Sequence, residues 1–201
     1  MNMGYVPLRG TLIGERTIPG SVPGWGMSVH AARYLWAMPR VDGHRVADLG
    51  CGTGYGSYLL SWSGATAVVG VDVSPEAIAY GQEHYAGVDY RVGDLTDPVT
   101  LPDADVAVCF EVLEHIAFPE RVLASALSRY ERLLLSMPNP LLGGSHLNPH
   151  HVQDWPLRKL KQQLRNAGAG HIHSYHQMHR NFAVIRGGPP WASSWVLEAR
   201  R

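Results

Sequence analysis

Strand-like and helical patterns alternate along the chain, and this alternation limits the fold more than any other feature. The strand-like runs are RVADLG (45–50), TAVVGVDV (66–73), VDYRVGD (88–94), ADVAVCFEV (104–112), RLLLSMP (132–138), HIHSYHQ (171–177) and SWVLEAR (194–200). Strands joined by helices pair in parallel, with helices on both faces of the sheet. Because no clear helical pattern separates the last two runs, we expect them to pair antiparallel. The sequence therefore predicts an α/β fold with a doubly wound, mostly parallel seven-stranded sheet and an antiparallel final strand pair.

The segments between the strands carry helix signals. SPEAIAYGQEHY offers Ser74 as an N-cap and Pro75 at the first helical position. FPERVLASALSRY and PLRKLKQQLRNAG place apolar residues three and four positions apart, and the second ends at Gly168, which favours a C-cap there. The stretch SVPGWGMSVHAARYLWAM, before the first strand, is typical of a loop followed by a helix.

The composition favours one compact domain over a disordered or fibrous chain. Of 201 residues, 45% are hydrophobic and 17% are charged, which suits a single hydrophobic core. No apolar run approaches the roughly 20 residues needed to cross a bilayer, and the start of the chain lacks the pattern of a secretion signal. We therefore expect a cytoplasmic protein without membrane contact, in which Cys51 and Cys109 are reduced and buried.

The net charge of zero hides an asymmetry between the two parts of the chain. Residues 1–120 hold 6 Lys and Arg against 14 Asp and Glu, whereas residues 121–201 hold 11 against 3. A basic second part could attract an anionic ligand, but the neutral total argues against broad, sequence-independent binding of nucleic acid. We expect two oppositely charged faces of one domain.

The residues that follow the first strand form a glycine-rich turn, DLGCGTGYG. Glycines at 50, 52 and 54 let the backbone turn tightly and approach a ligand closely. This is not the dinucleotide-binding pattern, because Tyr55 stands where that pattern requires its third glycine. Taken alone, the turn is also compatible with a plain structural role.

Acidic residues end the next two strands. Asp72 lies about 20 positions after the glycines, where a carboxylate can accept hydrogen bonds from both hydroxyls of a ribose. Asp94 ends the third strand, where it can accept from the exocyclic amine of an adenine while Leu95 donates its backbone N–H. In α/β sheets, ligands bind at the carboxyl ends of the strands. Glycines and acids in this order therefore predict a site shaped for adenosine.

Residues 40–140 resemble the class I S-adenosylmethionine-dependent methyltransferases. The segments that carry the resemblance are DLGCGTGYGS, GVDVSPEA, GDL and FEVLEHI. It implies that the glycine turn faces the methionine part of S-adenosylmethionine, Asp72 its ribose, and Asp94 with Leu95 its adenine. The cofactor-binding set is then Asp48, Gly50, Cys51, Gly52, Gly54, Asp72, Val73, Asp94, Leu95, Phe110 and Glu111.

The same resemblance suggests how the rest of the chain is used. We expect one methyltransferase domain over residues 1–201, with a cap segment at 1–38, a cofactor-binding core at 39–138, and an acceptor loop with the final strand pair at 139–201. In related folds the helix before the first strand covers the cofactor, which makes Trp25 and His30 candidate lining residues. GERTIPG is similar to a GERF(I/V)P segment of bacterial members associated with sugar or glycan modification, although Thr17 replaces the aromatic residue.

Two groups of polar residues are predicted to meet above the cofactor. Glu111, Glu114 and His115 stand at i, i+3 and i+4, so they share a face if the chain turns helical after the fourth strand. The segment SHLNPHHVQDW (145–155) follows the fifth strand and is expected to lie over them as a lid. The residues expected to bind the acceptor are Asn139, His146, Asn148, His150 and Trp155.

Three interpretations of these histidines remain open. In small-RNA 3′-terminal 2′-O-methyltransferases, a similar Glu-x-x-Glu-His segment and a later histidine hold a divalent ion, and Glu111, Glu114, His115 and His151 match that pattern. Magnesium or manganese would suit such a set. Without a metal, His115 or His151 acts as a base assisted by Glu114. In the third interpretation the histidines only satisfy the loop backbone.

The function that these observations favour is S-adenosylmethionine-dependent O-methylation of a sugar-containing or other small hydroxylated acceptor. An alternative is metal-assisted 2′-O-methylation of an RNA end or a nucleotide ribose. A third alternative, of a different class, is a non-catalytic cofactor-binding partner subunit. The sequence leaves the oligomeric state open.

Overall fold

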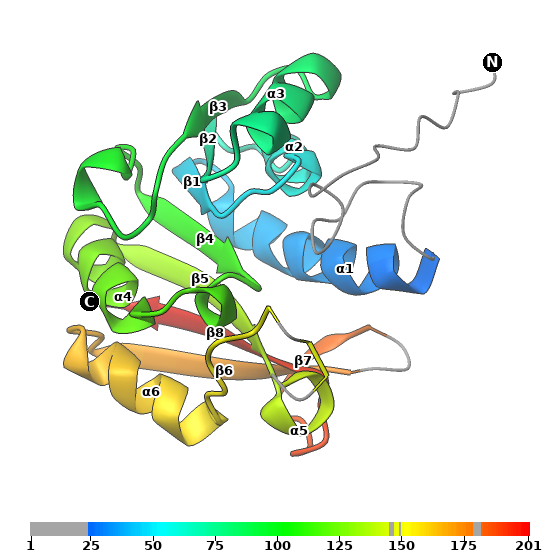
Figure 1. The fold of residues 1–201 in the computed structure, drawn as a ribbon, viewed down its shortest axis with the longest axis vertical. Coiled ribbons are helices and arrows are strands. Elements are labelled where there is room, and N and C mark those ends of the chain that lie inside the picture. The colour runs from blue at the N-terminus through cyan, green and yellow to red at the C-terminus, as the bar shows by residue number, and fades with distance from the viewer. Residues whose placement is uncertain (1–23, 145–146, 149, 179–181) are drawn as a thin grey trace.

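The computed structural model describes residues 24–144, 147–148, 150–178 and 182–201. It shows one sheet of eight strands in the order β3-β2-β1-β4-β5-β8-β6-β7, with helices packed on both faces (Figure 1). The parallel part consists of β1 (Arg45–Leu49), β2 (Ala67–Asp72), β3 (Asp89–Val92), β4 (Val106–Phe110) and β5 (Arg132–Pro138). The antiparallel part consists of β6 (His171–Gln177), β7 (Val184–Arg186) and β8 (Ser194–Arg200). The predicted α/β class and the antiparallel end pair are confirmed.

The predicted strand count is wrong by one. β7 has only three residues and pairs with β6 at the edge of the sheet. A segment this short shows too little alternation for a sequence pattern to detect. β5, β6 and β8 have the predicted bounds, while the other strands are shorter than their apolar runs.

Helices connect the strands as the sequence predicts. They are α1 (Gly24–Val41), α2 (Tyr55–Ser61), α3 (Pro75–His84), α4 (Pro119–Arg129), α5 (Pro140–Gly143) and α6 (Leu157–Asn166), with short 3₁₀ turns η1 (Pro98–Thr100) and η2 (Leu113–His115). Ser74 caps α3 by accepting the N–H of Ala77 at 3.2 Å, and Pro75 begins the helix. α6 has its C-cap at Ala167, one residue earlier than predicted, and Gly168 follows it with φ of 101°.

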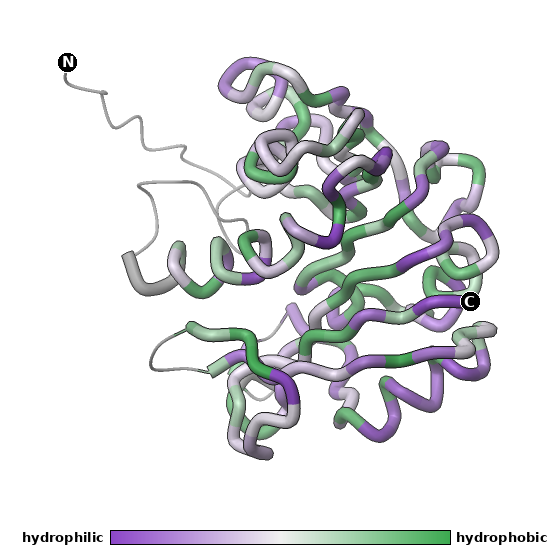
Figure 2. Tube along the Cα trace, turned by 180° about the vertical axis from the view of Figure 1, so that it is seen from behind, coloured by the Kyte–Doolittle hydropathy of each residue, from purple (hydrophilic) through white to green (hydrophobic). Residues whose placement is uncertain are grey.

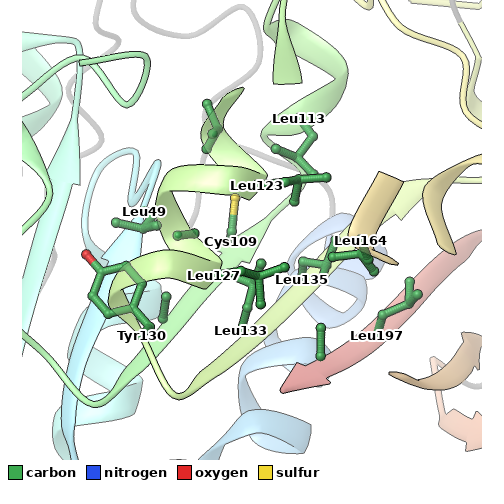
Figure 3. Close-up of a cluster of buried hydrophobic side chains, with 14 of the residues drawn as sticks. Leu49, Cys109, Leu113, Leu123, Leu127, Tyr130, Leu133, Leu135, Leu164 and Leu197 are labelled. Atoms are coloured by element: carbon green, nitrogen blue, oxygen red, sulfur yellow. The ribbon is translucent and has the colours of Figure 1, made fainter. Parts of the chain in front are cut away.

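Alternate residues of the central strands feed two hydrophobic clusters. Leu133 and Leu135 of β5 join the larger cluster, which packs against α4 and α6, and Leu134 points to the opposite cluster under α1 and α2. Figure 3 shows the larger cluster, where residues of β4, β5 and α4 meet. This two-sided burial is expected for parallel strands covered on both faces. Cys51 and Cys109 are free and buried, as predicted.

Hydropathy follows the same layers. Figure 2 shows hydrophobic residues concentrated along the central strands. Hydrophilic residues predominate along helix α6, which covers one face of the sheet. Among the described residues, no helix combines the length and apolar character needed to cross a bilayer.

Candidate functional site

A cavity of about 740 Å³ lies at the carboxyl ends of the parallel strands. Its walls come from the exits of β1 to β5, from α1, from the segment around residues 148–151 and from the start of β8. The predicted site residues that line it are Gly50, Cys51, Gly52, Asp72, Val73, Asp94, Leu95, Phe110, Glu111, Glu114, His115, Asn148, His150 and His151. The structure therefore brings together most of the residues singled out from the sequence. A volume of this size suits a small-molecule ligand.

Backbone hydrogen bonds fix the glycine turn against the end of β2. Gly50 and Cys51 donate their N–H groups to the carbonyl of Val71 at 2.7 and 3.0 Å. The Asp72 carboxylate accepts the N–H of Gly52 at 2.9 Å through one oxygen and the N–H of Ser74 at 3.0 Å through the other. Asp72 thus joins two strand exits while still lining the cavity.

Gly50 has no room for a side chain. Its φ is 77°, a conformation that favours glycine, and an added Cβ would collide with the side chain of Val112. Because Val112 also lines the cavity, the exits of β1 and β4 form one continuous wall.

Asp94 presents a charged oxygen at the third exit. It is exposed, and its carboxylate accepts the N–H and the hydroxyl of Thr96, each at 2.8 Å. These hydrogen bonds lower the pKa of Asp94, so the group is ionised at neutral pH. The neighbouring Leu95 is buried in the cavity wall.

Asp48 and Gly54 lie behind the cavity wall instead of lining it. Asp48 is completely buried and accepts a hydrogen bond from the hydroxyl of Ser57 at 2.7 Å, with the Tyr34 hydroxyl at 3.4 Å. Gly54 precedes α2 with φ of 90°, and the ring of Tyr90 occupies the space that a Cβ would need. For these two residues the structure shows a supporting position, which differs from the direct cofactor contact that the sequence predicted.

Glu111 is held on the α1 side of the cavity. Its φ of 54° is unusual for a residue other than glycine and marks a strained backbone position. Its carboxylate accepts the Ser136 hydroxyl at 2.7 Å and lies 3.7 Å from the guanidinium of Arg33. Among the described residues, the possible metal ligands whose atoms lie within 4.8 Å of one another are Glu114, His115 and His151. Glu111, which was predicted to belong to this group, is not one of them and instead contacts Ser136 and Arg33.

The buried Arg33 also fixes the tautomer of His30. Nη2 of Arg33 lies 3.1 Å from Nδ1 of His30, and a guanidinium can only donate, so this nitrogen accepts. Burial, together with the charge of Arg33, lowers the pKa of His30 to about 3. The ring is neutral at physiological pH with its proton on Nε2. His30 lines the cavity, where it can act as a hydrogen-bond donor but not as a base.

Glu114, His115 and His151 form a compact group at the other side of the cavity. One ligand atom from each lies within 4.8 Å of the others, and the two imidazole rings meet edge to face at 4.9 Å between centroids. Nδ1 of His115 donates to the backbone carbonyl of His150 at 3.2 Å. Nε2 of His115 lies 4.0 Å from a carboxylate oxygen of Glu114, and in the neutral ring this nitrogen would carry the lone pair.

The segment that carries His151 is bound to η2 through its backbone. Val152 and Gln153 both donate to the carbonyl of Glu114, at 2.8 and 3.1 Å. Asn148 supports the same arrangement, because its amide nitrogen lies 3.0 Å from Nε2 of His151. The predicted meeting of this segment with the FEVLEHI exit is therefore seen in the structure.

Two residues predicted to bind an acceptor lie outside the cavity. Trp155 is 2% exposed, belongs to the larger hydrophobic cluster, and donates its indole N–H to Gln153. Asn139 is 1% exposed and uses its amide nitrogen to bind the carbonyls of Pro190 and Ala192. Both were predicted to bind the acceptor, but each is buried and neither lines the cavity. His146 lies outside the described residues, as does the side chain of Trp25.

Several cavity residues were not predicted from the sequence. Tyr34 and Tyr55 come from α1 and α2, and Ser193 and Ser194 come from the start of β8. The serines could have been anticipated only by pairing β8 antiparallel to β5, which brings its first residues to the edge where β5 ends. The tyrosines carried no local signal, because aromatic residues on a covering helix are usually core residues.

The sheet topology defines an α/β protein of the Rossmann-like class. The glycine turn and the acidic strand exits line a cavity at the edge of this sheet, where proteins of this class bind nucleoside-type ligands. The family described as "Methyltransferase domain" matches residues 47–130. A probable S-adenosylmethionine-dependent methyltransferase of Mycolicibacterium smegmatis is 34% identical over 168 residues, covering 78% of this chain and 64% of that protein. A ubiquinone biosynthesis O-methyltransferase of Xanthomonas axonopodis is 30% identical over 159 residues, covering 67% of this chain and 66% of that protein.

A solved structure agrees on the fold. Magnesium protoporphyrin IX methyltransferase from Synechocystis, with bound SAH, superposes with a TM-score of 0.68 at 21% identity, covering 90% of this chain and 89% of that one. The chain belongs to the class I S-adenosylmethionine-dependent methyltransferase family. It spans slightly less than two thirds of the length of the curated relatives named above.

Asp48 gives a prediction about pH. Burial raises the pKa of this carboxyl from its ordinary 3.8 to about 7 in the folded chain. Between about pH 4 and 7, the folded state therefore keeps a proton that the unfolded state has lost. The stability of the fold falls as the pH rises through this window. In Asp48→Asn this decrease of stability with pH should disappear. In the wild type the decrease amounts to at most about 4 kcal/mol of the free energy of unfolding.

Thermal unfolding between pH 4.5 and 8 measures this difference. The melting temperature of the wild type should fall relative to that of Asp48→Asn as the pH rises. Asp103→Asn, at a side chain that is 85% exposed, is the control and should follow the wild type. Parallel curves for wild type and Asp48→Asn would show that Asp48 titrates normally.

Proposed function

We propose that the chain binds S-adenosylmethionine in the cavity and transfers its methyl group to a hydroxyl oxygen of a small acceptor. The observation that carries the proposal is the position of the Glu114, His115 and His151 group in the same cavity as the glycine turn, Asp72 and Asp94. The names of relatives, among them an O-methyltransferase, support transfer to oxygen. Sugar-containing acceptors remain our preferred class, and a relative's substrate is not assumed for this chain.

The residues of the first three exits fit the cofactor. The glycine turn can approach a ligand closely, because Gly50 and Gly52 line the cavity without side chains of their own. Each Asp72 oxygen accepts one backbone N–H, and a carboxylate oxygen can accept more than one hydrogen bond, so Asp72 can also accept from a ribose hydroxyl. The ionised Asp94 can accept from the adenine amine. Bound S-adenosylmethionine supplies a methyl group already activated by the sulfonium, so the protein mainly has to position the acceptor.

The histidine group suits a hydroxyl acceptor. With its Nδ1–H committed to the carbonyl of His150, His115 offers the Nε2 lone pair to an acceptor hydroxyl. As the acceptor oxygen takes the methyl group, its proton can pass to this nitrogen. Asn148 and His150 line the same wall and can orient further hydroxyls of the acceptor.

The same group also fits a divalent cation. One carboxylate and two imidazoles offer three ligands, and the backbone carbonyl on Nδ1 of His115 is the outer partner that metal-binding histidines commonly have. Since Glu111 does not contribute, imidazole ligands outnumber carboxylates, which favours manganese or zinc over magnesium. A cation bound through Nε2 of His151 would replace the contact of that nitrogen with Asn148.

The proposed domain plan follows from these positions. We propose that α1 and the segment before it form the cap, that the strands from β1 to β5 form the cofactor-binding core, and that residues 139–201 complete the acceptor side. His30 on α1 and the serines at the start of β8 then face the acceptor space from opposite elements.

Cofactor binding is tested by thermal shift. A saturating excess of S-adenosylmethionine at about 100 times its Kd should stabilise the wild type by about 2.7 kcal/mol, which raises Tm by several degrees. Asp72→Ala should abolish this shift and Asp94→Ala should reduce it. Asp94 is exposed, so its variant is expected to fold even if Asp72→Ala is destabilised. Asp103→Ala is the control, and an unchanged shift in both site variants would contradict the assignment.

Methyl transfer is tested by labelling. With methyl-labelled S-adenosylmethionine, we expect label to enter a hydroxylated acceptor from a panel of nucleotide sugars, glycans, phenols and RNA 3′ ends. His115→Ala should lower kcat at least about 100-fold, because general-base assistance contributes on that order. Label that enters only RNA ends would favour ribose methylation. Label in no acceptor, despite tight cofactor binding, would favour a non-catalytic partner subunit.

Metal binding has its own measurement. Equilibrium dialysis with Mn²⁺ or Zn²⁺ should show one bound ion per chain, lost in His151→Ala and in Glu114→Gln. His44→Ala, at a partly exposed histidine far from the group in the sequence, should bind as the wild type does. Stoichiometric binding that persists in both site variants, or full methyl transfer in excess chelator, would exclude a working metal at this group.

A further inference from the structure

Four large exposed apolar side chains lie on segments that adjoin the proposed acceptor side of the cavity. Leu141 (77% exposed), Leu142 (48%), Leu147 (63%) and Trp191 (67%) are here called the apolar rim. Leu141 and Leu142 belong to α5 and Trp191 to the turn before β8, and these two segments lie next to each other (Figure 1). Asn139 links them, because it caps α5 and donates to the carbonyls of Pro190 and Ala192 at 2.9 and 2.8 Å. Leu147 is tied to the same region by its bond to the carbonyl of Gly144.

The rim begins where the cavity wall ends. Pro138 and Asn148 line the cavity and flank the leucines of the rim in the chain. On the other side, Ser193 lines the cavity two residues after Trp191. An extended chain spans at most about 3.6 Å per residue, so the backbone of the rim begins within roughly 10 Å of the cavity wall. A ligand seated in the cavity can therefore reach it.

The two surfaces differ sharply in chemistry. The cavity side offers imidazoles, an amide and hydroxyls, whereas the rim offers only aliphatic and indole surface. Large exposed leucine and tryptophan side chains in one place are uncommon on a soluble surface and mark a binding site. A fully polar acceptor would use the cavity and leave the rim in water.

We propose that the acceptor is an amphiphile, whose hydroxylated head enters the cavity and whose alkyl or polyprenyl-like chain lies along the apolar rim. This inference rests on the proposed function, and it names the acceptor class more narrowly than a small polar sugar. The occupant is the acceptor's own chain because the rim is continuous with the acceptor side of the cavity and not with the glycine turn.

Alkyl β-D-glucosides of increasing chain length test the proposal below their micelle concentrations. Titration calorimetry in the presence of S-adenosylhomocysteine gives the affinities of methyl, hexyl and octyl glucoside. Burying one methylene fully is worth about fourfold in affinity, so partial burial should make octyl glucoside bind at least about tenfold more tightly than methyl glucoside. The double variant Leu141→Ser/Leu142→Ser and the single variant Trp191→Ser should each remove most of this gain.

Val99→Ser is the matched control, because Val99 is 87% exposed on η1 and does not line the cavity. It should keep the wild-type dependence on chain length. Equal affinities across the series in the wild type, undetectable binding of octyl glucoside, or the same loss in Val99→Ser would each overturn the proposal. Affinities that do not change with chain length, combined with dimerisation that depends on the rim residues in sedimentation, would also overturn it. So would such affinities combined with rim-dependent binding to phosphatidylcholine vesicles. In either case the apolar rim would bind a different partner.

The thermal shift with S-adenosylhomocysteine separates this test from that of the proposed function. Rim variants should keep the full shift, since none of the rim residues lies at the first three strand exits. A normal shift with a flat chain-length series rejects the amphiphilic acceptor alone. A wild type without any shift rejects cofactor binding, and with it the proposed function.

Discussion

The Asp72 carboxylate holds the exits of β1 and β2 together, and the shape of the cavity depends on this link. It accepts N–H groups from Gly52 in the turn and from Ser74 at the start of α3. The same Ser74 then caps α3 with its hydroxyl, so one short network sets the turn, the strand end and the helix start. Since the bonds run to backbone N–H groups, the turn keeps its shape without large side chains, and the cavity wall stays open. Asp48 supports the turn from behind, where Ser57 and Tyr34 bind it.

A second link closes the cavity from the side of α1. Arg33 is buried at 1% exposure and reaches the side chain of Gln177 on β6 at 2.6 Å, across 144 residues of sequence. A buried guanidinium requires several acceptors, and Gln177, His30 and Glu111 supply them. The strained backbone at Glu111 is what turns its carboxylate toward Arg33. α1 is therefore fixed over the cavity by polar contacts that also define the hydrogen-bonding face of His30.

The proposed acceptor side is built by a third set of contacts. Backbone bonds from Val152 and Gln153 to Glu114 place His151 beside His115, while Asn139 joins α5 to the turn before β8. The polar group and the apolar rim thus come from different segments that meet at one edge of the sheet. This division explains how one cavity can combine a common cofactor side with an acceptor side of its own character.

Local patterns in the sequence were enough to predict the α/β class, the parallel pairing of the earlier strands, and the residues at the first three strand exits. These follow from local patterns, because side-chain periodicity reports burial and because parallel strands must all end at the same edge of the sheet. The meeting of the histidine segment with the FEVLEHI exit was also predictable, since β4 and β5 are neighbours. Only the tertiary structure decided which polar residues serve the site and which serve the scaffold. Trp155 and Asn139 became core and linker residues, and Glu111 turned to Arg33, because each found partners far away in the sequence. Such pairings depend on three-dimensional packing, and no local spacing encodes them.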